Sequence, residues 1–134
     1  MNLHAHPLVR MLRALDLPAD DYVVFGSGPL LAHGLRTNIG DLDVVARGRA
    51  WQALTAAARP VATPSGHGRM VRLQIEAVTD WLPGFDTDHL IRSAELHAGI
   101  PFASLAEVRR SKLTARRPKD WPDLALIDSA LTTV

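Results

Sequence analysis

Two aspartates separated by one residue, Asp41 and Asp43, are the side chains in this sequence best suited to carry chemistry. They open an apolar run that is expected to form a strand over 41–46. Residues i and i+2 of a strand share a face, so both carboxylates should project from one end of a sheet. Two carboxylates at such short range repel each other unless a cation lies between them. Because Mg²⁺ favours one or two carboxylates plus substrate phosphates, the pair predicts a divalent-metal site.

A glycine-rich turn lies upstream, where residues 26–29 (Gly-Ser-Gly-Pro) end the apolar run 22–25. Its two glycines permit a tight turn and close approach of the backbone to a ligand. Ser27 is a favourable N-cap and Pro29 suits the first helical position, so a short helix over 29–33 or 29–34 should follow. The free N–H groups of that helix would point back at the turn, which predicts an anion site.

The combination of motifs resembles the signature of the nucleotidyltransferase superfamily, which has the polymerase-β-like fold. The motifs are Gly26-Ser27, a short helix, and then Asp41-x-Asp43 on the next strand. The resemblance implies that Gly26 and Ser27 bind the triphosphate of an NTP. It also implies that Asp41, Asp43 and a third carboxylate bind two Mg²⁺ ions and are catalytic. The long spacer, with Leu35-Arg36-Thr37, is closer to the AbiEii-type branch than to the most compact minimal nucleotidyltransferases of toxin–antitoxin pairs.

The third carboxylate is expected on the run 69–78, which is predicted to be the longest strand. Alternate positions from 71 to 77 are apolar, and Glu76 would lie on the more polar opposite face. A single acidic residue in a strand is usually a solvated edge residue. The resemblance instead implies a metal-binding and catalytic carboxylate in this region, for which Glu76 is the best placed residue and Asp80 is the alternative.

The C-terminal third carries a second resemblance, to the same region of small bacterial nucleotidyltransferase-like proteins. There a helix lysine, here Lys112, precedes an Arg-x-Lys-Asp turn, here 117–120, and a last helix containing Asp123. One interpretation is a solvated face on which the basic residues pair with Asp120 and Asp123; such surface pairs contribute under about 1 kcal/mol each. The other is that Lys112 binds the triphosphate, since its point charge suits phosphate.

The chain totals favour one ordinary globular domain over 1–134. Of the 134 residues, 47% are apolar and 22% are charged, so disorder is not expected. A net charge of +1 does not favour binding of long nucleic acid, because such binding normally requires a strongly basic face. The absence of cysteine excludes disulfides and thiolate metal sites and is compatible with the cytoplasm. No membrane span or signal-peptide core is expected.

The fold class expected is α/β (α+β), a single nucleotidyltransferase domain with a small mixed sheet flanked by helices. Periodicity and turn signals predict helices and strands that alternate along the chain. The expected elements are a helix within 1–17, a strand at 22–25, the short helix after Ser27, a strand at 41–46, a helix at 50–59, a strand at 61–63, a turn at 64–68, a strand at 69–78, a helix at 89–95 capped within 86–88, an edge strand within 97–102, and helices at 104–115 and 122–131.

Three functions are compatible with these features of the sequence. The first is an enzyme that transfers a nucleoside monophosphate from NTP to a protein, an RNA end or a small molecule, within a toxin–antitoxin system. The second is a non-catalytic interaction module of a toxin–antitoxin pair that retains the fold and binds a cognate partner. The third is an α/β domain in which the two motifs coincide by chance. Metal-dependent NTP binding separates the first from the others.

Overall fold

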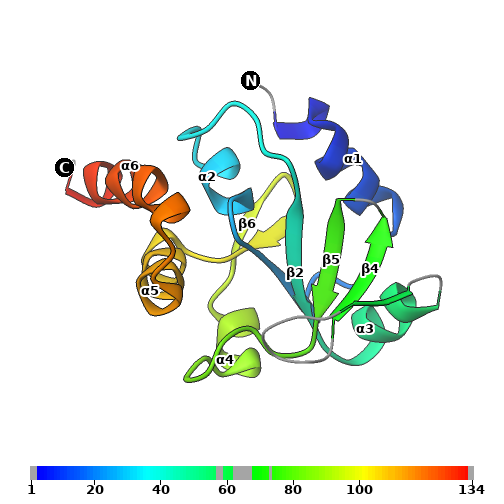
Figure 1. Cartoon of the computed structure of the whole chain (residues 1–134). Helices are drawn as coiled ribbons and strands as arrows, with labels where there is room; N and C mark the ends of the chain where they lie inside the picture. Colours follow the sequence, from blue (N-terminus) through cyan, green and yellow to red (C-terminus); the bar gives the residue numbers. More distant parts are fainter. Residues whose placement is uncertain (1–2, 57–58, 62–67, 73, 133–134) are drawn as a thin grey trace.

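A seven-stranded mixed sheet forms the centre of the molecule, with helices on both of its faces (Figure 1). This architecture confirms the predicted mixed α/β class. The computed structural model describes residues 3–56, 59–61, 68–72 and 74–132. The helices are α1 (Pro7–Ala14), α2 (Gly28–Ala32), α3 (Gly48–Thr55), α4 (Thr87–Arg92), α5 (Leu105–Ala115) and α6 (Trp121–Thr132), with 3-10 turns η1 (Leu3–Ala5) and η2 (Pro118–Asp120). The strands are β1 (Tyr22–Phe25), β2 (Leu42–Ala46), β3 (Arg59–Val61), β4 (Gly68–Arg72), β5 (Ile75–Val78), β6 (Glu95–His97) and β7 (Ile100–Phe102).

The strand order is β3-β4-β5-β2-β1-β7-β6, so β1, β2 and β5 lie in the interior of the sheet. β1 and β2 are antiparallel, whereas β2 pairs with β5 and β1 with β7 in parallel. Hairpins complete both edges, with β3 beside β4 on one side and β6 beside β7 on the other. The strands that carry the candidate motifs are therefore the central ones.

Alternation along the central strands divides the core into two layers. Tyr22 and Val24 of β1 pack with buried residues of α1 and α3, while Val23 and Phe25 pack with buried residues of α4, α5 and α6. Figure 1 shows the same division, with α1 and α3 on one side of the sheet and α4, α5 and α6 on the other. The second layer is the one that faces the candidate site.

Several predicted elements are confirmed at or near their expected bounds. Strand β1 spans the predicted residues, and β2 begins one residue later than predicted. Ser104 caps α5 by accepting a hydrogen bond from the Glu107 N–H, and Asp86 caps α4 by accepting one from the His89 N–H. Helix α3 begins at Gly48, earlier than expected. The predicted strand at 61–63 is observed at Arg59–Val61, and the predicted turn residues 64–67, His67 included, lie outside the described residues.

The single long strand predicted over 69–78 is wrong. Two strands, β4 and β5, occupy this run and pair antiparallel, with Met70 opposite Glu76 and Arg72 opposite Ile75. The prediction failed because the two residues between the strands, Leu73-Gln74, include none of the residue types that commonly mark a turn.

The predicted edge strand within 97–102 is also wrong in detail. The chain reverses at Ala98-Gly99, so that the edge strand is β6 and the strand containing Pro101 lies between β1 and β6. Helix α4 consequently ends at Arg92 and not at Glu95. Proline is tolerated in this interior strand because the ladder between β1 and β7 is short, with Val24 opposite Phe102.

Candidate functional site

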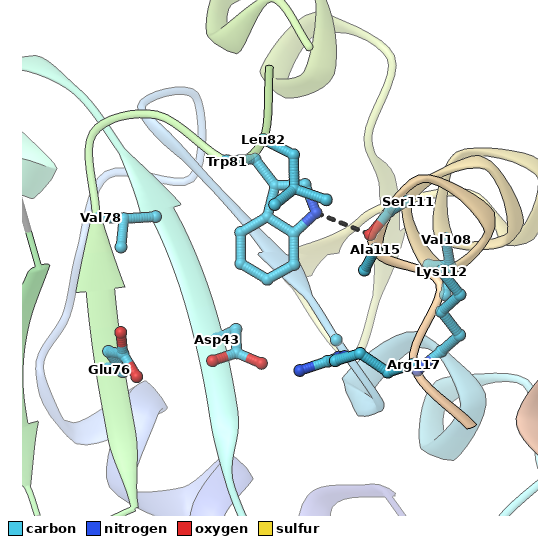
Figure 2. Close-up of a pocket in the computed structure, with 11 residues that line it drawn as sticks. Asp43, Glu76, Val78, Trp81, Leu82, Val108, Ser111, Lys112, Ala115 and Arg117 are labelled. Atoms are coloured by element: carbon cyan, nitrogen blue, oxygen red, sulfur yellow. Dashed lines mark hydrogen bonds between the residues drawn. The ribbon is translucent and has the colours of Figure 1, made fainter. Parts of the chain in front are cut away.

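Asp43 and Glu76 are neighbours on the sheet, because β2 and β5 run parallel with these two residues in register. Leu42 and Val44, on either side of Asp43, are buried in the layer under α1 and α3, so the Asp43 side chain points to the opposite face. Figure 2 shows both carboxylates on their adjacent strands. Asp41 lies one residue before β2 and lines the same cleft. The structure thus brings the three predicted metal ligands together.

Gly26 is fitted to Asp43. It follows β1 directly, has φ +67°, and would place a Cβ atom only 2.4 Å from the Asp43 Oδ2 atom. Any side chain here would be strained by the left-handed backbone and would collide with the carboxylate. The glycine is therefore required for the carboxylate to lie against the turn.

Ser27 occupies the predicted N-cap position of α2, but the prediction that its side chain caps the helix is wrong. Its backbone is already helical (φ −90°, ψ −7°), whereas a capping serine is usually extended, and no side-chain cap bond forms. The Ser27 hydroxyl instead donates to Asp123 Oδ2 at 3.3 Å. α2 itself has five residues. The Ser27 hydroxyl therefore contacts the cleft, while the Ser27 carbonyl oxygen accepts hydrogen bonds from the Leu30 and Leu31 N–H groups of the helix.

Lys112 is buried, with 5% of its surface exposed, and its ammonium group lies 3.2 Å from Asp120 Oδ1 and 3.3 Å from Asp123 Oδ2. Both aspartates are also buried. The interpretation of these residues as a solvated face is therefore wrong for all three, although their pairing is as expected. A buried charge needs compensating partners, and the two carboxylates supply them.

Arginines extend this cluster on both sides. Arg117 donates to Asp120 Oδ2 at 2.9 Å, and Arg36 lies 3.5 Å from Asp123 and 3.4 Å from the Ser27 hydroxyl. Burial opposes ionisation of Asp120, but the hydrogen bond from Arg117 and the charge of Lys112 outweigh it and lower the pKa of this carboxyl. Arg36 and Arg117 belong to the sequence segments that carry the two family resemblances. Their positions in the sequence do not by themselves predict that both lie beside the same cluster.

The cleft has two compartments that share Gly26, Asp43, Glu76, Lys112 and Arg117. One, with a volume of about 390 Å³, is otherwise lined by apolar side chains and one serine: Val78, Trp81, Leu82, Val108, Ser111 and Ala115. The other, of about 370 Å³, is otherwise lined by polar and charged residues: Ser27, Arg36, Asp41, Lys119, Asp120 and Asp123. The carboxylates on the strands therefore lie at the boundary between an apolar hollow and a charged one.

Trp81 forms a wall of the apolar compartment, and sequence analysis did not identify it as a site residue. Its indole N–H donates to the Ser111 hydroxyl at 2.8 Å (Figure 2), and its ring lies 5.0 Å from the ring of Phe25 between centroids. These contacts hold the indole in one orientation beside the cleft. The sequence gives no signal for this role, because an apolar turn containing tryptophan is equally compatible with core packing.

The electrostatics of the strand carboxylates depend on their number and burial. Desolvation, together with the charges of Asp41 and Glu76, raises the pKa of Asp43 to about 7, although Arg117 and Lys112 act in the opposite direction. Burial and the charge of Asp41 also raise the pKa of Glu76. Asp80, the alternative third carboxylate, is exposed and is not among the residues lining either compartment.

The three carboxylates fit Mg²⁺. Their donors are all oxygen, and a bound cation would relieve the repulsion and desolvation that hold Asp43 near half-protonation at neutral pH.

Comparison with family models, with curated proteins and with solved structures finds no match to any of them. Among the described helices, none combines the length and apolar character that crossing a bilayer requires.

Proposed function

We propose that the chain is a metal-dependent nucleotidyltransferase, in which an acceptor hydroxyl attacks the α-phosphate of an NTP, takes up the nucleoside monophosphate and releases pyrophosphate. The observation that carries the proposal is the meeting of three carboxylates, Asp41, Asp43 and Glu76, with the Gly26-Ser27 turn at the boundary of an apolar and a charged compartment. An NTP has the same division of chemistry, since its base is flat and apolar on its faces and its triphosphate is anionic. A cytoplasmic location and a place in a toxin–antitoxin system belong to the same proposal.

Binding of the two ends of the nucleotide follows from the lining residues. Basic side chains at the charged compartment, Arg36, Lys112, Arg117 and Lys119, supply donors for phosphate oxygens. The indole of Trp81 at the apolar compartment gives a surface on which a base can stack. The base would then lie on one side of the strand carboxylates and the phosphates on the other.

The carboxylates hold and position the reacting groups. Asp41, Asp43 and Glu76 would ligate Mg²⁺, which when bound neutralises phosphate charge and stabilises the attacking and departing oxygens. Glu76, as a carboxylate near the acceptor, would take the proton of the attacking hydroxyl. Lys112 is paired with Asp120 and Asp123, which leaves the third N–H donor of its ammonium group for a phosphate oxygen. Positioning and charge stabilisation would supply most of the catalysis.

The test is calorimetric titration of each NTP into the protein, with and without Mg²⁺, followed by transfer of α-labelled nucleotide to protein and RNA fractions. Binding should require Mg²⁺ and be lost in Asp43→Asn, while Asp80→Asn, an exposed carboxylate outside the cleft, should bind as the wild type does. Ser27→Ala should raise the dissociation constant. Equal binding by wild type and Asp43→Asn, or no binding of any NTP, would contradict the proposal.

A second function, a non-catalytic interaction module, is favoured by one observation. The Ser27 hydroxyl and the Lys112 ammonium, two groups that would hold phosphate, are already paired with carboxylates of the chain itself. A protein that never binds nucleotide would keep such pairs closed. Failure to bind any NTP, together with stable co-purification of a partner protein, would support this second function.

A further inference from the structure

A group of three metal-ligating side chains lies away from the nucleotide cleft, where α2 ends against the edge of the sheet. His33 is the C-cap of α2, and Glu95 and His97 belong to the edge strand β6. One ligand atom from each of the three lies within 4.8 Å of the others. None of them lines either compartment of the cleft. We propose that these residues form a binding site for a divalent transition-metal ion such as Zn²⁺.

The local structure explains why the three side chains meet. Glu95 and His97 are two residues apart on one strand, so they point to the same face. The hairpin turn that follows has positive φ at both of its residues, Ala98 (54°) and Gly99 (78°), as a tight two-residue turn requires. His33 then approaches from α2, and its ring lies 4.9 Å from the ring of His97 between centroids, edge to face.

The distances suit a tetrahedral ion. Zn–N and Zn–O bonds of about 2.0–2.1 Å place neighbouring tetrahedral ligands about 3.3–3.4 Å apart. Glu95 Oε1 lies 3.1 Å from His33 Nε2 and 3.5 Å from His97 Nε2, values on either side of that spacing. The two imidazole nitrogens lie within 4.8 Å of each other, so side-chain rotation would have to bring this third pair to the same spacing, with the fourth position left for water or another ligand.

An unsatisfied atom provides independent support. His97 Nε2 is buried and has no hydrogen-bond partner among the described residues. Its ring is held on its other sides by His33 and by Phe102, whose ring centroid is 5.8 Å away. A buried polar atom without a partner is unfavourable, and a metal ion is one partner that a histidine nitrogen accepts. The structure thus places an imidazole nitrogen that makes no hydrogen bond 3.5 Å from the Glu95 carboxylate, within the group of three donors.

The donor set determines the class of ion. Two imidazoles and one carboxylate suit Zn²⁺ and its transition-metal neighbours, whereas Mg²⁺ prefers oxygen donors alone. This chemistry differs from that of Asp41, Asp43 and Glu76, so the two sites would select different ions. A bound ion would join the end of α2 to β6, although these elements are far apart in sequence.

The test is titration of ZnCl₂ into the full chain by calorimetry in excess Mg²⁺, so that the oxygen-only site is already occupied. One Zn²⁺ should bind per chain and raise the thermal midpoint. His33→Gln, Glu95→Gln and His97→Gln should each weaken binding at least about tenfold. His89→Gln, a histidine outside the group, and Asp43→Asn should bind as the wild type does.

Two results would overturn the proposal. One is absence of Zn²⁺ binding by a wild-type protein whose circular dichroism shows it to be folded. The other is wild-type affinity in both His33→Gln and His97→Gln, which would place the ion elsewhere; His4→Ala would then test the N-terminal histidines as its ligands. Because the His33 side chain is more than a quarter exposed, His33→Gln is expected to fold even if His97→Gln does not.

Discussion

Asp43→Asn should stabilise the metal-free protein at alkaline pH, although it removes a central residue of the candidate site. Burial and two neighbouring carboxylates raise the pKa of Asp43 from its ordinary 3.8 to about 7. A difference of roughly 3 pKa units corresponds to about 4 kcal/mol of unfavourable ionisation once the group is fully charged. Because the Asp43 side chain keeps some contact with solvent, we expect about half of this, about 2 kcal/mol, to be recovered.

The pH dependence follows from the direction of the shift. Between the unfolded pKa of 3.8 and the folded pKa of about 7, the folded protein retains a proton that the unfolded chain has released. The contribution of Asp43 to the free energy of unfolding therefore falls as the pH rises through this window and is lowest above it. The advantage of Asp43→Asn should be small near pH 4 and complete above about pH 7.

Chemical denaturation in EDTA, at about pH 5 and about pH 8, measures the effect. Wild type, Asp43→Asn and the control Asp80→Asn are compared at each pH, and the gain in the first variant should be larger at the higher pH. Added Mg²⁺ should then stabilise wild type at about pH 8 but not Asp43→Asn. The reasoning is refuted if Asp43→Asn is less stable than wild type in EDTA at the higher pH, or if its gain is the same at both.

Substitutions at three other positions test separate features. Gly26→Ala should lower the free energy of unfolding by about 2–4 kcal/mol, because a Cβ atom in the left-handed backbone would meet Asp43 at 2.4 Å; denaturation midpoints measure it, and an unchanged midpoint would contradict the fit. Asp120→Ala should lower the free energy of unfolding by about 3 kcal/mol, because it removes a partner of buried Lys112. Asp120→Asn should lower it less, because the amide oxygen can still accept a hydrogen bond from Lys112. Ala98→Gly should stabilise by about 1 kcal/mol, since φ is 54° there, and a lower thermal midpoint would count against it.

Strands β1 and β2 could be predicted because each is a short apolar run that ends at a recognisable break. All four residues of β1 are buried, and Gly26 marks the end of the strand. The two hairpins could not be predicted in the same way. One reverses between Arg72 and Ile75, where the intervening sequence lacks turn-forming residues, and the other places Ala98, a residue that rarely adopts positive φ, in the left-handed region. In both, the local sequence gives too weak a turn signal to place the reversal.

The candidate site could be predicted only in part, because local spacing indicates which residues share a direction but not which strands are neighbours. The spacing of Asp41 and Asp43 indicates a shared direction, but nothing local shows that β5 lies next to β2, so the place of Glu76 came only from the family resemblance. Lys112 shows the limit of reasoning from charge pattern. Its pairs with Asp120 and Asp123 look like surface pairs in sequence, and only the packing of α5 and α6 over the sheet shows that they are buried.

The parallel pairing of β2 with β5 has a consequence for how the protein is made. The charges of the site are supplied in a fixed order during synthesis: Asp41 and Asp43 first, Glu76 next, and the cations Lys112 and Arg117 only with the last two helices. A nascent chain that has formed the β2–β5 pair therefore holds three clustered carboxylates before Lys112 and Arg117, the cations that act to lower the pKa of Asp43, have been synthesised. Repulsion among them would keep this intermediate weakly ordered until α5 docks, or until Mg²⁺ binds, which couples completion of the fold to completion of the site.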